Sequence, residues 1–178
     1  ISSHVLWRTL MVPCLQFHDL QAVRTNTEQV TSLSHPHPQC LAATTAFATA
    51  IHDLLTHDDI DPEAITKRCH EAACKQLEPD DSKGEPLESL WAGHLIELDL
   101  DDHDDPGNLF KALGCAFFGL RASSSQDFKS VLCEIVMEGG DADANAAMGG
   151  AMLGCRLGYS QLPKDWINSV LHSSFVDE

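Results

Sequence analysis

Apolar side chains recur every three or four residues along most of this sequence of 178 residues. Between residues 37 and 57, such a stripe is formed by Leu41, Thr45, Ala48, Ile51 and Leu55. This spacing places the side chains on one face of an α-helix, whereas a half-buried strand requires alternation with a period of two. No alternation persists long enough to require a sheet. The pattern therefore predicts an all-α fold.

Start and stop signals divide the chain into helical segments. Asp61-Pro62-Glu63 is a strong start, because Asp caps free N–H groups and Pro suits the first helical position. Residues 78–85 form a polar break that contains Pro79 and Gly84. The expected helices span 19–32, 37–57, 61–77, 87–98, 108–120, 125–137, 141–157 and 163–172. Because no internal repeat or long linker divides them, they predict a single all-α domain over residues 1–178.

Cap residues are expected at the starts of two of these helices. Asp19 is expected to cap the helix over 19–32, and Ser125 the helix that ends at Met137. The helix over 87–98 would turn Leu90, Trp91 and Leu95 inward. The three tryptophans, Trp7, Trp91 and Trp166, are expected to be core or helix-packing aromatics rather than base-stacking platforms.

Acidic residues outnumber basic ones, with 27 Asp and Glu against 11 Lys and Arg and a formal net charge of −16. Nucleic-acid backbones and anionic membranes would repel such a chain, so we expect neither as a partner. No secretory signal and no apolar run of about 18 residues is visible, which argues against membrane insertion. With 43% hydrophobic residues, these features predict a folded, soluble, cytoplasmic protein.

Seven cysteines are spread along the chain without the spacing of a disulfide framework: Cys14, Cys40, Cys69, Cys74, Cys115, Cys133 and Cys155. Most lie in apolar, helix-like runs, which is typical of reduced, buried cysteines in an intracellular protein. Cys69 and Cys74 are too far apart in sequence for a zinc knuckle.

The densest charge run spans residues 99–105. A calcium-binding loop requires a Gly near its middle and a Glu at its twelfth position. Gly107 comes too late to be that Gly, so the run is expected to be a solvated loop.

Residues 138–147 read Glu-Gly-Gly-Asp-Ala-Asp-Ala-Asn-Ala-Ala and precede an apolar, helix-like run. Gly139 and Gly140 allow a sharp turn and a close approach to a ligand. Asp141 and Asp143 are of the residue type that binds hard cations such as Mg²⁺. Alternatively, they form an acidic helix cap that satisfies free N–H groups and the helix dipole. Spacing alone leaves both interpretations open.

The run from Val136 to Ala147, continued by Leu153-Gly154-Cys155, resembles the C-terminal signature of the ADP-ribosylglycohydrolase family, also described as dinitrogenase reductase-activating glycohydrolase-like. The resemblance continues through Gly158, Leu162-Pro163 and Trp166, and upstream through residues 17–20, 34–38 and 110–114. These segments occur in the family's order, so the resemblance covers nearly the whole chain.

The resemblance implies an all-α enzyme with two Mg²⁺ ions that cleaves ADP-ribose from a conjugate. Asp141 and Asp143 match two of the family's carboxylate ligands, while Ala144 stands where the family carries a hydroxyl ligand. The family's other metal motif, a hydroxyl residue followed by Asp-Asp, does not occur in these residues. We therefore expect the C-terminal portion of such a helical bundle, truncated on the N-terminal side, with at most a partial Mg²⁺ site.

The resemblance also implies substrate contacts. Residues 2–8 match a family substrate loop, which makes Ser3 a candidate for contact with ADP-ribose; Gly140 is a second. His35 matches a family histidine next to the ADP-ribose, although without the resemblance it reads as a surface turn residue. Asn108 replaces an aromatic residue of the family.

Two functional hypotheses follow. In the first, the chain is part of a glycohydrolase that a companion chain or missing segment completes with the absent metal motif. In the second, it is a non-catalytic, degenerate family member that serves as a binding or structural module, with a partner or a second copy covering its exposed apolar helix faces. Ala144, the altered residues 2–8 and Asn108 favour the second hypothesis if the chain is complete.

Overall fold

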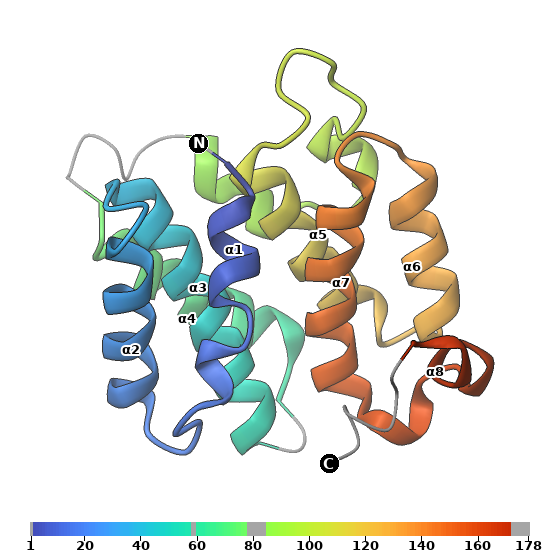
Figure 1. The fold of residues 1–178 in the computed structure, drawn as a ribbon, viewed down its shortest axis with the longest axis horizontal. Coiled ribbons are helices and arrows are strands. Elements are labelled where there is room, and N and C mark those ends of the chain that lie inside the picture. The colour runs from blue at the N-terminus through green and yellow to red at the C-terminus, as the bar shows by residue number, and fades with distance from the viewer. Residues whose placement is uncertain (1, 58–59, 78–84, 172–178) are drawn as a thin grey trace.

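The computed structural model describes residues 2–57, 60–77 and 85–171. Within them, every regular element is helical, and the only strand-like pairing is one isolated bridge between Ser2 and Asn108 (Figure 1). The all-α prediction is therefore confirmed. The elements are α1 (His4–Thr9), η1 (Val12–Cys14), α2 (Leu20–Ser32), α3 (Pro38–Thr56), α4 (Pro62–Cys74), η3 (Glu85–Trp91), η4 (Leu95–Leu98), α5 (Leu109–Ala122), α6 (Phe128–Met137), α7 (Ala142–Leu157), η5 (Tyr159–Gln161) and α8 (Lys164–Ser169).

The helix starts follow the local capping signals. Asp19 accepts hydrogen bonds from the first backbone N–H groups of α2, and Asp61 accepts one from Ala64 in α4, as predicted. The cap of α6 was assigned wrongly. Asp127, not Ser125, caps this helix by accepting the N–H of Ser130. An Asp carboxylate is a stronger cap acceptor than the hydroxyl two residues earlier, because it carries a charge.

The helix predicted over 87–98 is wrong. The segment forms two short 3₁₀ helices, η3 and η4, which are separated at Gly93. The Arg121 guanidinium, on α5, donates to the carbonyls of Leu90 and Ala92 and so uses acceptors that a continuous helix would need. Trp91 is 46% exposed instead of turned inward.

Two elements at the start of the chain, α1 and η1, were not predicted. Val5 and Leu6 of α1 are buried, while Trp7 is 43% exposed. Trp7 is therefore not a core residue, and its ring contacts that of His4 edge to face on the same helix. Val5, Leu6 and Thr9 form the buried face of α1, and Trp7 lies with Arg8 on the opposite, exposed face.

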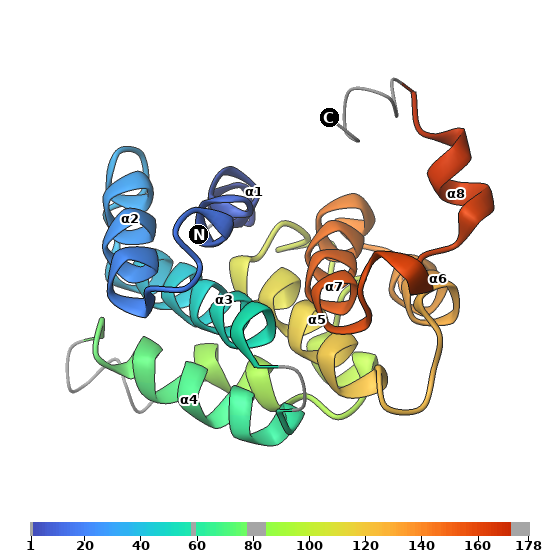
Figure 2. The ribbon, with the colours of Figure 1, turned by 90° about the horizontal axis from the view of Figure 1, so that it is seen from below.

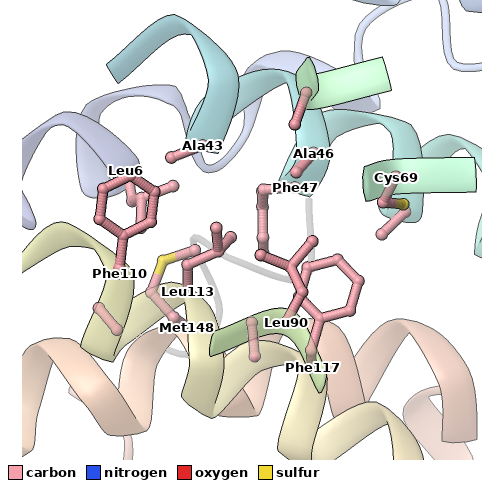
Figure 3. Packing of buried hydrophobic residues seen from close by; sticks show 14 of the residues in the cluster. Leu6, Ala43, Ala46, Phe47, Cys69, Leu90, Phe110, Leu113, Phe117 and Met148 are labelled. Carbon is pink, nitrogen blue, oxygen red and sulfur yellow. The ribbon is translucent and has the colours of Figure 1, made fainter. Parts of the chain in front are cut away.

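The core is built by helices that are distant in sequence. Helix α3 packs against both α2 and α4, and α7 packs against both α5 and α6 (Figure 2). Phe47 from α3, Leu113 and Phe117 from α5, and Met148 from α7 meet in one buried cluster (Figure 3).

Helices α5 and α7 approach each other closely because a glycine stands at their contact. A Cβ atom added to Gly119 would lie 3.0 Å from the carbonyl oxygen of Gly149. Such a distance leaves no room for a side chain between the two backbones.

Among the described residues, no helix is long and apolar enough to cross a membrane.

All seven cysteines are free. Cys40, Cys69 and Cys115 are buried, whereas Cys133 is exposed on α6. Burial raises the pKa of the Cys115 thiol to about 12 and that of Cys155 to about 11, because a thiolate is poorly solvated there.

These differences predict the order of thiol modification. In the native protein near neutral pH, a thiol reagent is expected to react first with Cys133, and with Cys115 only on unfolding. Kinetics with a chromogenic disulfide reagent, followed by peptide mapping, measure this order. Cys133→Ser is expected to remove the fast phase. A fast phase that survives this substitution would contradict the assignment.

Candidate functional site

Segments from both ends of the sequence meet at one end of the bundle. The N-terminal loop, the loop over 99–107 and the start of α7 lie together at the top of Figure 1. The backbone N–H of Ser3 donates to the carbonyl of Gly107 at 2.9 Å. The Ser3 Oγ donates to Asp141 Oδ2, also at 2.9 Å, although the two residues are 138 positions apart. The structure therefore brings together two of the residues that the sequence singled out.

Burial and close packing restrain the contact between Ser3 and Asp141. Ser3 is only 1% exposed. A Cβ atom on Gly107 would lie 3.7 Å from Asp141 Oδ2 and 4.0 Å from Ser3 Oγ, so Gly107 borders the pair closely. A buried hydroxyl bonded to a carboxylate oxygen has few alternative rotamers, and it fixes the orientation of that carboxylate.

The Gly139-Gly140 turn is required by packing. Gly139 and Gly140 have φ of +81° and +64°, a conformation that other residues rarely adopt. A Cβ atom on Gly140 would lie 1.9 Å from the carbonyl oxygen of Leu100. The sequence predicted a close approach at this position, and the group that approaches is the backbone of the acidic loop. A substrate contact at Gly140 stays a prediction.

Asp141 is not an ordinary helix cap. It occupies the N-cap position of α7, yet its side chain accepts no hydrogen bond from the helix backbone. The carboxylate accepts from Ser3 instead. Asp143 lies exposed in the first turn of α7. Of the two interpretations that the sequence left open, the cap therefore does not describe the side chain of Asp141.

The surroundings of Asp141 disfavour its charged form. Burial raises the pKa of Asp141, and the neighbouring Asp143 carboxylate raises it further. The hydrogen bond from Ser3 and the nearby His4 act in the opposite direction without cancelling the rise. A bound cation or a proton would relieve the repulsion within this pair.

This raised pKa predicts how stability depends on pH. An acid whose pKa is higher in the folded than in the unfolded chain stabilises the fold at low pH, and this contribution is lost as the pH rises through its folded pKa. The unsubstituted protein loses this contribution as the pH rises, and Asp141→Asn does not. The stability of Asp141→Asn relative to the unsubstituted protein is therefore expected to increase from acidic to neutral pH. Urea unfolding at both ends of this range measures the difference.

Asp127→Asn is the matched control. Hydrogen bonds from Ser130 lower the pKa of Asp127, so its contribution is present above its unfolded pKa and lost as the pH falls. Asp127→Asn should then become less stable toward neutral pH, opposite to Asp141→Asn. If both variants shifted in the same sense, the raised pKa of Asp141 would be refuted.

His35 is not joined to the Ser3–Asp141 pair by a hydrogen bond in the described part of the chain. It lies partly buried in the turn between α2 and α3, with its Nδ1 2.7 Å from Ser34 Oγ. His37 has a structural role, because its Nδ1 accepts the N–H of Gln39 at the start of α3. An ADP-ribose contact at His35 thus remains a prediction.

The donor set does not fit a two-ion magnesium centre. Across residues 2–57, 60–77 and 85–171, no group of three or more His, Cys, Asp or Glu side chains is arranged to hold a metal ion. Ala144, fully buried on α7, supplies no oxygen. Mg²⁺ requires near-octahedral oxygen coordination, and Asp141 and Asp143 supply only part of it.

A cavity of about 770 Å³ adjoins the site. Its lining comes from the start of α3, from η3 and η4, and from the residues around the start of α5: Gln39, Glu88, Ser89, Trp91, Ala92, Glu97, Leu98, Asp105, Asn108, Phe110 and Lys111. Asn108 connects cavity and site, since its backbone pairs with Ser2. The sequence singled out Asn108 but gave no signal for the cavity, because its walls come from separate segments.

Comparison with known proteins identifies the family of the chain. The family model of ADP-ribosylglycohydrolase matches residues 3–178. A curated protein of Acanthamoeba polyphaga mimivirus, provisionally named an ADP-ribosyl glycohydrolase, is 46% identical over 94 residues. This match covers 47% of the chain and 28% of the relative, so the chain spans well under two thirds of the relative's length. The chain belongs to the ADP-ribosylglycohydrolase family.

Proposed function

We propose that this chain forms the C-terminal part of an ADP-ribosylglycohydrolase-type hydrolase, which cleaves ADP-ribose from a conjugate once the missing metal ligands are supplied. The observation that carries the proposal is the hydrogen bond from Ser3 to Asp141. It joins a predicted substrate residue to a predicted metal ligand across nearly the whole sequence. We expect the chain to act as one domain in the cytoplasm.

In this proposal, Asp141 and Asp143 contribute carboxylates to Mg²⁺, and the remaining ligands come from a companion chain or from a segment outside these residues. Ser3 holds the carboxylate of Asp141 in place. His35 and Gly140 contact the ADP-ribose. The net charge of −16 gives a further role to the cation, because the diphosphate of ADP-ribose would otherwise meet a repulsive surface.

Calorimetric titration with Mg²⁺, and then with ADP-ribose, tests the proposal. Ser3→Ala is expected to weaken Mg²⁺ binding about tenfold, since residues that orient metal ligands typically contribute about 10–100-fold. Asp143→Asn should weaken it further. Asp165→Asn is the control, because Asp165 pairs with Lys129 at the surface. Equal Mg²⁺ binding by Ser3→Ala, Asp143→Asn and Asp165→Asn would overturn the assignment.

Hydrolysis is measured separately on an ADP-ribosylated polypeptide, with and without the polypeptides that co-purify with the chain. A companion that carries a hydroxyl-Asp-Asp motif and restores ADP-ribose release supports the proposal. If ADP-ribose binds but is never released from the conjugate, the hydrolase assignment fails while the binding assignment stands.

A second candidate is a non-catalytic module, and Ala144 favours it because this buried position lacks the hydroxyl of the family. Exposed apolar side chains around α1 point the same way: Met11 is 66% and Leu15 is 61% exposed. Exposed apolar surface often marks an interaction site. A stable dimer in sedimentation, with no hydrolysis under any of these conditions, would favour this candidate.

A further inference from the structure

One wall of the cavity beside the candidate site is apolar. Ala92, Leu98 and Phe110 line it and are buried. Trp91 adds an aromatic side chain that is 46% exposed. The close packing of Leu98 on α5, where a Cβ on Gly114 would lie 2.5 Å from Leu98 Cδ2, fixes this wall. This wall suits an aliphatic or flat group.

The exposed part of the lining is acidic. Glu88, Glu97 and Asp105 all line the cavity and reach solvent. Lys111 is the basic residue of the lining, and its Nζ lies 3.4 Å from Asp102 Oδ2, so an acidic partner already offsets its charge. The cavity thus presents carboxylates beside an apolar wall.

Neighbouring groups offset only part of this charge. Glu97 accepts the N–H groups of Gly93 and His94, and it interacts favourably with the Arg121 guanidinium. Asp105 accepts a neutral hydrogen bond from Asn108 Nδ2 at 2.7 Å. Other titratable groups are also near: the ring centroid of His70 lies 6.1 Å from that of Trp91, the backbone of His94 is bonded to Glu97, and Glu63 interacts favourably with Arg121.

We infer that this cavity binds a basic side chain, Lys or Arg, of a polypeptide partner. Lys and Arg carry an apolar stem that suits the apolar wall and a cationic head that suits the carboxylates. Trp91 offers a ring face to the cation. A diphosphate would be repelled by the same carboxylates, so the cavity is not a phosphate site. The inference does not rest on the proposed hydrolase activity.

The tryptophan indole signals in a ¹H–¹⁵N NMR spectrum give a direct readout, with Trp91→Phe identifying the signal of Trp91. The probes are Nα-acetyl-lysine amide, Nα-acetyl-arginine amide and the neutral isostere Nα-acetyl-citrulline amide. Either cationic probe is expected to shift the Trp91 signal and to leave those of Trp7 and Trp166 in place, and the stronger of the two identifies the preferred side chain. If citrulline binds as well as arginine does, the inference is overturned.

The variant Glu88→Gln combined with Asp105→Asn removes two charges but keeps the shapes of both side chains. It is expected to weaken binding of the cationic probe at least about threefold, the range of partly exposed ion pairs. Glu134→Gln on α6, outside the cavity, should bind like the unsubstituted chain. Unchanged affinity in the double variant would overturn the inference. None of the probes contains ADP-ribose, so failure here is distinguishable from failure of the proposed hydrolase.

Discussion

Replacing Gly140 with alanine is expected to destabilise the fold by about 3–5 kcal/mol, because a left-handed backbone and a steric clash add together. The backbone of Gly140 has a φ of +64°. The added Cβ would lie 1.9 Å from the carbonyl oxygen of Leu100, which is backbone and cannot rotate away. Since domains of this kind are stable by only about 5–15 kcal/mol, urea unfolding will show this loss clearly.

Two further variants separate the causes. Gly140→Asn tolerates the left-handed backbone but still carries the clashing Cβ, so it should remain strongly destabilised. Gly154→Ala is the matched control within α7, where the nearest atom would lie 3.8 Å from the new Cβ. It should stabilise the helix by about 0.5–1 kcal/mol. Full recovery in Gly140→Asn would show that the clash with Leu100 does not matter.

Local signals predicted much of the helical fold. The starts of α2 and α4 depend on Asp19 and Asp61, which act on backbone groups within a few residues. The conformation of the segment over 87–98 could not be predicted from local signals. Its leucine spacing favours a helix, but Arg121, distant in sequence, binds the carbonyls of Leu90 and Ala92 and so favours 3₁₀ turns. Tertiary contacts override periodicity when they take the same acceptors.

The candidate site was predictable only in parts. The carboxylates of Asp141 and Asp143 were visible as a motif. The partner of Asp141 was not, because spacing says nothing about residues 138 positions apart, and only the family resemblance placed Ser3 in the same site. The freedom of a Gly-Gly backbone predicted a close approach at Gly140, but the group that the structure places there is the carbonyl of Leu100.

Besides Gly140→Ala, a second large loss of stability is expected from a substitution in the core. Phe117 on α5 is fully buried and lies in the cluster shared by α3, α5 and α7 (Figure 3). Phe117→Ala should destabilise the fold by about 3–5 kcal/mol, from lost transfer energy and the cavity left behind. Phe117→Leu keeps most of the volume and should cost under about 1.5 kcal/mol. Leu33→Ala, at a position that is 80% exposed, should change stability by less than about 0.5 kcal/mol.

The consequence of Phe117→Ala for the site follows from the geometry of the helices. Asn108 stands directly before α5 and Asp141 directly before α7, so the packing of these helices sets the distance between the ends that carry the site. Hydrogen exchange in Phe117→Ala should therefore accelerate at the first amides of both helices that bond to a backbone carbonyl, those of Ala112 and Asn145, as well as beside the substituted residue. Faster exchange confined to the middle of α5 would mean that the site is held by its own loop contacts, such as the one between Gly140 and Leu100, and not by the core beneath it.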